Sequence, residues 1–398
     1  MPQDAPTPDA DARRHSAALA TRIRAAADAA GGTLRFDRYM AMALYEPGLG
    51  YYSAGQARFG SGGDYITAPL ASTLFSRTLA HQCAEVLTRL GGGDVLEFGA
   101  GTGRMAADVL TELAALQRLP QRYRILEVSA TLRQEQATAI AELPADIRER
   151  VEWLDQLPDE PFRGMVLANE VMDALPVRRF QITEDGIHEL AVAHDGEKFQ
   201  YRLIPADDTL TMAIREIEAD LDAPLPPGYV SEYCPALAGW LQTLADCLDA
   251  GTALLIDYGY PRREYYHRQR AMGTLLCHYR HRAHDDALWW PGLQDITASV
   301  DFTAAARAAT NAGLALQGFT TQANFLMGAG LPGLLEAEMN RDPQAAAAAT
   351  QQAKPLLMPG EMGERFKVLA VGRGLTDPLS GFGFADQSGR LNVHRRHS

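Results

Sequence analysis

The chain has 398 residues, of which 46% are hydrophobic and 22% are charged, a composition typical of a globular protein large enough for more than one lobe. Its formal net charge of −13 disfavours general binding to nucleic acids or anionic membranes and leaves only a local basic patch for such a partner. The four cysteines form no Cys-x-x-Cys pair and no apolar stretch approaches membrane-spanning length, which favours a reduced, cytoplasmic protein without a membrane span.

The N-terminal segment, residues 1–15, is rich in proline, aspartate and alanine and is predicted to be a disordered tail. It contains no apolar signal core, so neither secretory nor mitochondrial targeting is expected. Helices are predicted over Ser16–Ala30, which ends at two glycines, and over Phe36–Leu44. The next stretch, 48–67, is rich in glycine and aromatic residues and either folds over a ligand or forms an exposed loop. We assign residues 16–71 to an N-terminal helical cap that carries this loop.

Five short apolar segments then alternate with predicted helices. This is the pattern of a parallel sheet covered by helices on both faces. Polar residues end each segment, and in open α/β sheets ligands bind at the carboxyl edge. We predict the strands over 95–98, 123–128, 151–154, 164–168 and 252–256. The core is therefore expected to begin with residues 72–175 and to resume at residue 251.

An insertion of about seventy residues separates the fourth and fifth strands, far more than a usual connection. It contains a predicted hairpin, 187–193 and 198–204, that turns at Asp195-Gly196. Predicted helices over 210–221 and 236–248 follow it. We assign 176–250 to this α+β insertion on the substrate side.

The chain after the fifth strand is expected to complete the core over residues 251–374. Two further strands are predicted over Gln317–Leu326 and Glu364–Val371, with helical segments between them. Residues 375–398 are expected to be a loose tail.

The central motif is Glu97-Phe98-Gly99-Ala100-Gly101-Thr102-Gly103, between the first strand and a predicted helix. Glycines at alternate positions let backbone N–H groups and a helix N-terminus approach a ligand. A dinucleotide fingerprint requires a third small residue where Arg104 stands, which disfavours NAD. The pattern instead resembles the cofactor loop of Rossmann-like methyltransferases that use S-adenosylmethionine. A tight turn without a ligand is the alternative.

Two acids end the next two strands. Glu127, after the second strand, can accept both hydroxyls of a ribose, as found in S-adenosylmethionine and in NAD. Asp155, after the third strand, can accept an adenine amino group. The alternatives are a solvated acid for Glu127 and a turn-forming aspartate for Asp155.

The end of the fourth strand carries the candidate acceptor site. Asn169 is expected beside the cofactor, and Glu170 and Asp173 follow it within one short turn. Methyl transfer requires an acceptor held in line, and a cationic acceptor requires carboxylates that hold and polarise it. Asp257, after the fifth strand, is the further candidate for this role. A pair of helix-capping acids is the alternative for Glu170 and Asp173.

The stretch 262–290 is rich in arginine, histidine and aromatic residues. Cys277, His278, His281 and His284 do not have the spacing of a structural zinc site, and no metal is expected. An RNA-contacting patch disagrees with the overall acidity. We interpret the stretch as a loop that shapes the substrate mouth, with an exposed basic loop as the alternative.

Together these motifs resemble the MidA-like methyltransferases, a family that includes a mitochondrial complex I assembly factor that methylates a protein arginine. The resemblance runs from about residue 33 to 373 and depends on several motifs in the same order. They are Gly63-Asp64-Tyr65-Ile66-Thr67, Leu96–Gly103, Ala168–Pro176, Ile256–Tyr260, Tyr279–Asp286 and Pro291–Thr297.

The resemblance implies a class I methyltransferase sheet, S-adenosylmethionine as cofactor and a protein arginine acceptor such as a complex I subunit. It also implies that Gly63, Asp64, Tyr65 and Thr67 lie near the cofactor. Without a visible targeting segment, the chain resembles a bacterial-type cytoplasmic member. A catalytically idle assembly chaperone and an NAD-linked oxidoreductase are the competing hypotheses.

Overall fold

The computed structural model describes residues 7–54, 67–341 and 343–393, and the chain divides into two compact units. Each unit is assembled from segments that lie far apart in the sequence. Unit 1 comprises Met1–Tyr65, Asp173–Leu237 and Tyr260–Asp301. Unit 2 comprises Ile66–Met172, Ala238–Gly259 and Phe302–Ser398.

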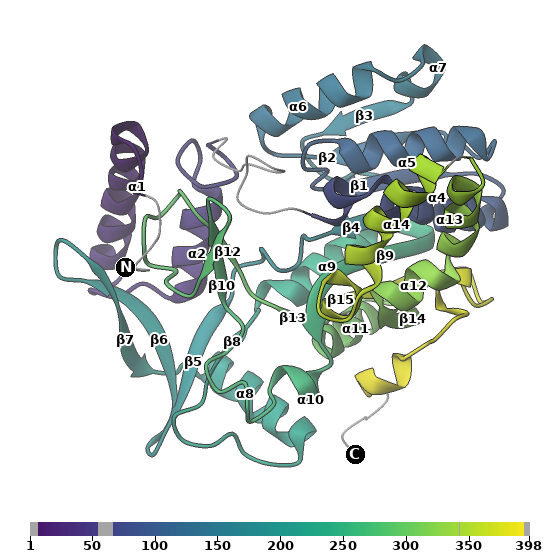
Figure 1. Cartoon of the computed structure of the whole chain (residues 1–398). Coiled ribbons are helices and arrows are strands. Elements are labelled where there is room, and N and C mark those ends of the chain that lie inside the picture. The colour runs from purple at the N-terminus through teal and green to yellow at the C-terminus, as the bar shows by residue number, and fades with distance from the viewer. Residues whose placement is uncertain (1–6, 55–66, 342, 394–398) are drawn as a thin grey trace. The chain divides into compact units, whose positions relative to one another are not determined.

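Unit 2 is built on a sheet with the strand order β14-β15-β9-β4-β1-β2-β3 (Figure 1). The strands β1 to β4 and β9 are parallel, and β15 pairs antiparallel with both β9 and β14. Their bounds are β1 Asp94–Phe98, β2 Tyr123–Leu126, β3 Val151–Leu154, β4 Phe162–Asn169, β9 Leu248–Tyr260, β14 Ala315–Thr321 and β15 Phe366–Arg373. The expected parallel core is confirmed.

The strand order places the candidate site. From β1 the chain proceeds outward through β2 and β3, and then returns to add β4 on the other side of β1. In open parallel sheets, ligands bind at the carboxyl ends of the strands where the order reverses. The reversal here lies between β1, which ends at Phe98, and β4, which ends at Asn169.

Helices cover both faces of this sheet, as expected, and every residue of β1 is buried. One large core cluster joins α4, α5 and α14 to the central strands. On β1 the ring of Phe98 meets Trp240 of α9 edge-on, with the centroids 5.4 Å apart. The helices are α3 Ala68–Ala71, α4 Thr73–Leu90, α5 Arg104–Ala115, α6 Ala130–Ala141, α7 Ala145–Arg148, α9 Ala236–Cys247, α11 Phe302–Asn311, α12 Gln322–Gly328, α13 Leu331–Met339, α14 Pro343–Leu357 and α15 Met362–Arg365. No described helix is both long and apolar enough to cross a membrane.

Unit 1 contains the predicted hairpin as β6 and β7, within an antiparallel sheet of order β7-β6-β5-β8. Asp195 Oδ1 closes the predicted turn by accepting the N–H groups of Glu197 and Lys198. A smaller sheet has the order β11-β10-β12. The elements are α1 Ala10–Ala29, α2 Phe36–Tyr45, β5 Arg178–Thr183, β6 Gly186–His194, β7 Phe199–Pro205, α8 Asp208–Leu221, β8 Val230–Tyr233, α10 Arg262–Tyr265, β10 Leu276–Tyr279, β11 Arg282–His284, β12 Asp295–Thr297 and β13 Val300–Asp301.

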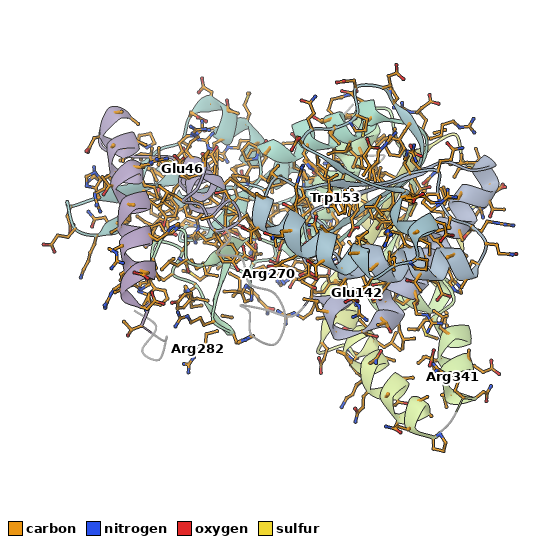
Figure 2. All side chains as sticks on the ribbon, turned by 90° about the horizontal axis from the view of Figure 1, so that it is seen from above. Glu46, Glu142, Trp153, Arg270, Arg282 and Arg341 are labelled. Carbon is orange, nitrogen blue, oxygen red and sulfur yellow. The ribbon has the colours of Figure 1, made fainter. Side chains whose placement is uncertain are left out.

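The stretch 262–290 is thus a short helix and a β-hairpin rather than one long loop. Arg282 is exposed on the edge strand β11, and its side chain extends away from the hairpin (Figure 2). Cys277 is fully buried, and burial raises the pKa of its thiol. Among the described residues, no cluster of three histidine, cysteine or acidic side chains could hold a metal ion.

Three further segments differ from the sequence-based expectation. Residues 10–15 are helical because Asp9 Oδ1 accepts the N–H of Ala12 and so begins α1. The predicted strand Gln317–Leu326 ends at Thr321, whose side chain caps α12 by accepting the N–H of Asn324. Within the expected loose tail, Ser380–Phe382 and Ser388–Leu391 form two 3₁₀ turns, and the apolar side chains of Leu379, Phe382 and Leu391 are buried.

Candidate functional site

The glycine loop between β1 and α5 holds its glycines in the left-handed region, with φ of 60° at Gly99, 53° at Gly101 and 82° at Gly103. A Cβ at Gly103 would lie 2.8 Å from the Cα of Gln136, so this glycine permits close packing against α6. A Cβ at Gly101 would meet no atom of the described residues within 4 Å. The loop therefore borders open space at Gly101, as a ligand-binding loop requires.

Glu97, one residue before the end of β1, has a fully buried carboxyl group. Its Oε2 accepts a 2.7 Å hydrogen bond from the hydroxyl of Tyr123, while its Oε1 has no hydrogen-bond partner among the described residues. Burial raises the pKa of Glu97 to about 7, although the hydrogen bond from Tyr123 acts in the opposite direction and lowers it. A buried acceptor without a partner is costly. It fits a ligand that brings a donor, such as the ammonium group of S-adenosylmethionine.

Glu127, directly after β2, is buried and held in one orientation. Its Oε1 accepts the N–H of Ser129 at 2.8 Å, and its Oε2 accepts Nε2 of Gln136 at 3.0 Å. Burial raises its pKa, and these hydrogen bonds lower it. A carboxylate fixed in this way at a strand end suits the ribose role predicted for Glu127.

Asp155 follows β3 with a largely exposed carboxylate, which pairs with Arg133 of α6 at 2.8 Å. Arg133 also donates from Nε to the carbonyl of Glu127, so it joins the ends of β2 and β3. The contact with adenine stays a prediction. Thr67 precedes α3, and its carbonyl accepts the N–H groups of Leu70 and Ala71. Gly63, Asp64 and Tyr65 lie outside the described residues.

The end of β4 has an unusual backbone. Glu170 adopts a left-handed conformation with φ of 56°, and its N–H donates to the carbonyl of Ile256 at 2.9 Å. Such a conformation costs a non-glycine residue about 1 to 3 kcal/mol and is enriched at functional sites. Asn169 Nδ2 donates to Glu170 Oε1 at 3.2 Å, while the buried Oδ1 of Asn169 has no hydrogen-bond partner in the described part of the chain.

The two other acids predicted to be catalytic have different surroundings. Asp257 is fully buried, and its carboxylate accepts the N–H groups of Met172 at 3.0 Å and Tyr258 at 2.9 Å. These bonds favour a role in positioning the turn after β4 over contact with an acceptor. Asp173 belongs to unit 1 and is buried there. Its backbone carbonyl accepts the N–H of Ala298.

Sequence reasoning missed Gln136 and Tyr123, which hold the two acids of the site. Neither belongs to a recognisable motif. Tyr123 could have been suspected because a buried tyrosine hydroxyl usually finds a partner and Tyr123 pairs in register beside Val95. Nothing in the local sequence distinguishes Gln136 from other helical glutamines.

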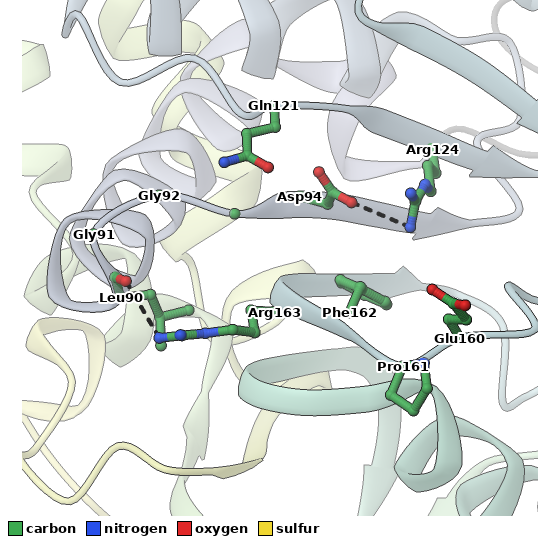
Figure 3. Close-up of a pocket in the computed structure, with 11 residues that line it drawn as sticks. Leu90, Gly91, Gly92, Asp94, Gln121, Arg124, Glu160, Pro161, Phe162 and Arg163 are labelled. Atoms are coloured by element: carbon green, nitrogen blue, oxygen red, sulfur yellow. Dashed lines mark hydrogen bonds and ion pairs between the residues drawn. The ribbon is translucent and has the colours of Figure 1, made fainter.

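A separate cavity of about 410 Å³ lies at the opposite, amino edge of the sheet (Figure 3). Asp94 and Arg124 form a 3.1 Å ion pair in its wall, and Arg163 donates to the carbonyl of Leu90. Because it adjoins the starts of β1 and β4 rather than their ends, this cavity is not the predicted cofactor site.

The profile of a protein family described as "Putative S-adenosyl-L-methionine-dependent methyltransferase" matches residues 78–320. The chain belongs to this methyltransferase family. The mitochondrial protein arginine methyltransferase NDUFAF7 of Danio rerio is 30% identical over 86% of the chain and 84% of its own length. The human protein of that name is 27% identical over 85% of the chain and 80% of its own length.

A crystal structure of a "likely methyl transferase" from Burkholderia thailandensis, bound to S-adenosyl-homocysteine, is similar to this methyltransferase throughout. The two share 43% identity and a TM-score of 0.92, over 97% of this chain and all of the other. The resemblance to MidA-like methyltransferases, the class I fold and S-adenosylmethionine as cofactor are thereby confirmed. The NAD-linked alternative does not fit this family.

Proposed function

We propose that this methyltransferase transfers the methyl group of S-adenosylmethionine to an arginine side chain of a protein acceptor, in the cytoplasm. A respiratory complex I subunit is the first acceptor to test. The proposal is supported by the relatives named as protein arginine methyltransferases and by the site's chemistry. Its central observation is the strained Glu170 at the end of β4, at the point where the sheet order reverses.

An arginine acceptor makes a specific demand on the protein. Its guanidinium stays protonated at cellular pH, since its pKa lies above about 12, and its nitrogen is therefore a poor nucleophile. A carboxylate can bind the planar group through two hydrogen bonds and polarise it. The cofactor supplies an electrophilic methyl group on a sulfonium. Glu170 supplies the carboxylate, which Asn169 holds through its 3.2 Å hydrogen bond.

The direct test is transfer of a labelled methyl group to candidate acceptors purified from the organism of origin. Mass spectrometry should place the label on an arginine, and replacement of that arginine by lysine should abolish it. Label on another residue type would overturn the arginine assignment. A protein that binds S-adenosyl-homocysteine but labels no acceptor, in lysate or purified, would instead support the idle assembly chaperone.

A further inference from the structure

Gln136 of α6 makes three hydrogen bonds from one fully buried amide. Its Nε2 donates to the carbonyl of Gly101 at 3.0 Å and to Glu127 Oε2 at 3.0 Å. Its Oε1 accepts Nε1–H of Trp153, on β3, at 3.0 Å. These bonds use both amide protons and define the orientation of the amide, because a flipped amide would face two acceptors with its oxygen.

The partners of Gln136 belong to two different parts of the cofactor site. Gly101 lies in the glycine loop, which approaches one end of the cofactor, whereas Glu127 is the acid predicted for the ribose. The backbones of the glycine loop and α6 also approach each other closely, since a Cβ at Gly103 would lie 2.8 Å from the Cα of Gln136. Helix α6 therefore supports the loop and the acid together.

A neutral amide is suited to this position. Glu127 Oε1 already accepts from Ser129, and Gln136 supplies the matching donor to Oε2 without adding charge. An acid at position 136 would place two carboxyls in contact, and an apolar side chain would leave the Gly101 carbonyl and Glu127 Oε2 without this donor.

We infer that Gln136 is a positioning residue that preorganises the cofactor site by fixing the glycine loop and the ribose carboxylate relative to each other before the cofactor binds. It acts through Gly101 and Glu127. The inference does not depend on which acceptor is methylated. It extends the site to α6, where no sequence motif places it.

The test compares Gln136→Met, which keeps the length of the side chain and removes its hydrogen bonds, with Gln134→Met. Gln134 is exposed on the same helix and serves as the matched control. Calorimetry with S-adenosyl-homocysteine should show affinity at least about tenfold weaker for Gln136→Met, the scale of one or two lost hydrogen bonds. Hydrogen exchange of the 99–103 amides in the ligand-free protein should be faster in this variant, and Gln134→Met should match the wild type in both measurements.

A third variant, Gln136→Glu, separates positioning from general loss of stability. With two carboxyls in contact, binding should be weak at neutral pH and should recover as the pH falls and the pair takes up a shared proton. Wild-type affinity and wild-type loop exchange in Gln136→Met would overturn the inference. An equal loss of affinity in Gln134→Met would also overturn it. The same holds if the weak binding of Gln136→Glu does not change with pH. If Gln136→Met does not fold, the pH response of Gln136→Glu decides.

Discussion

The hydroxyl of Tyr123 donates a 2.7 Å hydrogen bond to Oε2 of Glu97 from the neighbouring strand, and both side chains are fully buried. Burial raises the pKa of Glu97 from 4.5 to about 7. The folded protein therefore keeps this proton over a pH range in which the unfolded chain has released it. The contribution of Glu97 to the free energy of unfolding is therefore highest below about pH 4.5, falls as the pH rises, and levels off above about pH 7.

We predict that Glu97→Gln removes this pH dependence from the ligand-free protein. We compare the free energy of unfolding of the variant with that of the wild type at each pH. The difference should shift in favour of the variant by about 2 to 3 kcal/mol from about pH 5 to pH 8, since one pKa unit corresponds to about 1.4 kcal/mol. Urea unfolding at a series of pH values measures the difference. Glu142→Gln, which changes an exposed acid, is the control measured beside it. A pH-independent difference for Glu97→Gln would contradict the raised pKa.

We predict that Gly101→Val abolishes binding of S-adenosyl-homocysteine while the protein still folds. The added side chain would enter the open space beside the loop, and a β-branched residue resists the left-handed backbone. Gly91→Val is the matched control, because Gly91 also has positive φ and open space around its Cβ but ends α4, away from the site. Both variants should lose similar stability, and only Gly101→Val should lose binding by calorimetry. Equal binding in both would remove this loop from the cofactor site.

The sheet and the glycine loop could be predicted because their signals are local. Short apolar runs such as the one before Phe98 mark buried strands, and glycines directly after a strand mark a close approach to a ligand. The prediction was wrong at Gln322–Leu326, which is helical although the segment follows directly from β14. The side chain of Thr321 accepts the N–H of Asn324 and so begins α12.

The support around the site could not be predicted because its partners are distant in sequence. Gln136 bonds to Gly101, which lies 35 positions away, and Trp153 lies 17 positions away. The left-handed backbone of Glu170 depends on the neighbouring strand, where the carbonyl of Ile256 accepts its N–H. Asp257 was predicted to end a strand, but it lies within β9, which continues to Tyr260 because β15 pairs with it there. Only the structure shows that the backbone N–H groups of Met172 and Tyr258 donate to its carboxylate.

We predict that Glu127→Ala weakens cofactor binding by about 1.5 to 3 kcal/mol, the scale of hydrogen bonds to a charged group. Glu127 directly follows β2, and its carboxylate is already oriented by Ser129 and Gln136. Calorimetry with S-adenosyl-homocysteine measures the change. Glu135→Ala, at an exposed position of α6, should bind as the wild type does. An unchanged dissociation constant for Glu127→Ala would place the ribose elsewhere.

We predict that Glu170→Gly stabilises the fold by about 1 kcal/mol, since glycine adopts positive φ without the strain that a glutamate pays there. Urea unfolding checks this value. The glycine variant should also lose methyl transfer, because the carboxylate is gone. The glutamate at this position would then lower the stability of the fold and be required for methyl transfer. A less stable glycine variant would show that contacts of the Glu170 side chain outweigh its backbone strain.

Charge at position 170 is tested most directly by Glu170→Gln, which keeps the shape of the side chain and its left-handed backbone. If the carboxylate holds and polarises the guanidinium, transfer of labelled methyl should fall by at least about a hundredfold, the scale for removing one preorganised electrostatic group. Binding of S-adenosyl-homocysteine should stay as in the wild type, since Glu170 is not itself one of the predicted cofactor contacts. Single-turnover transfer to a purified acceptor separates these effects, with Glu142→Gln as the exposed control. Normal turnover by Glu170→Gln would exclude a carboxylate clamp at this position. Lost cofactor binding would instead assign Glu170 to the cofactor, and Asp173 would then be the next acid to test against the acceptor.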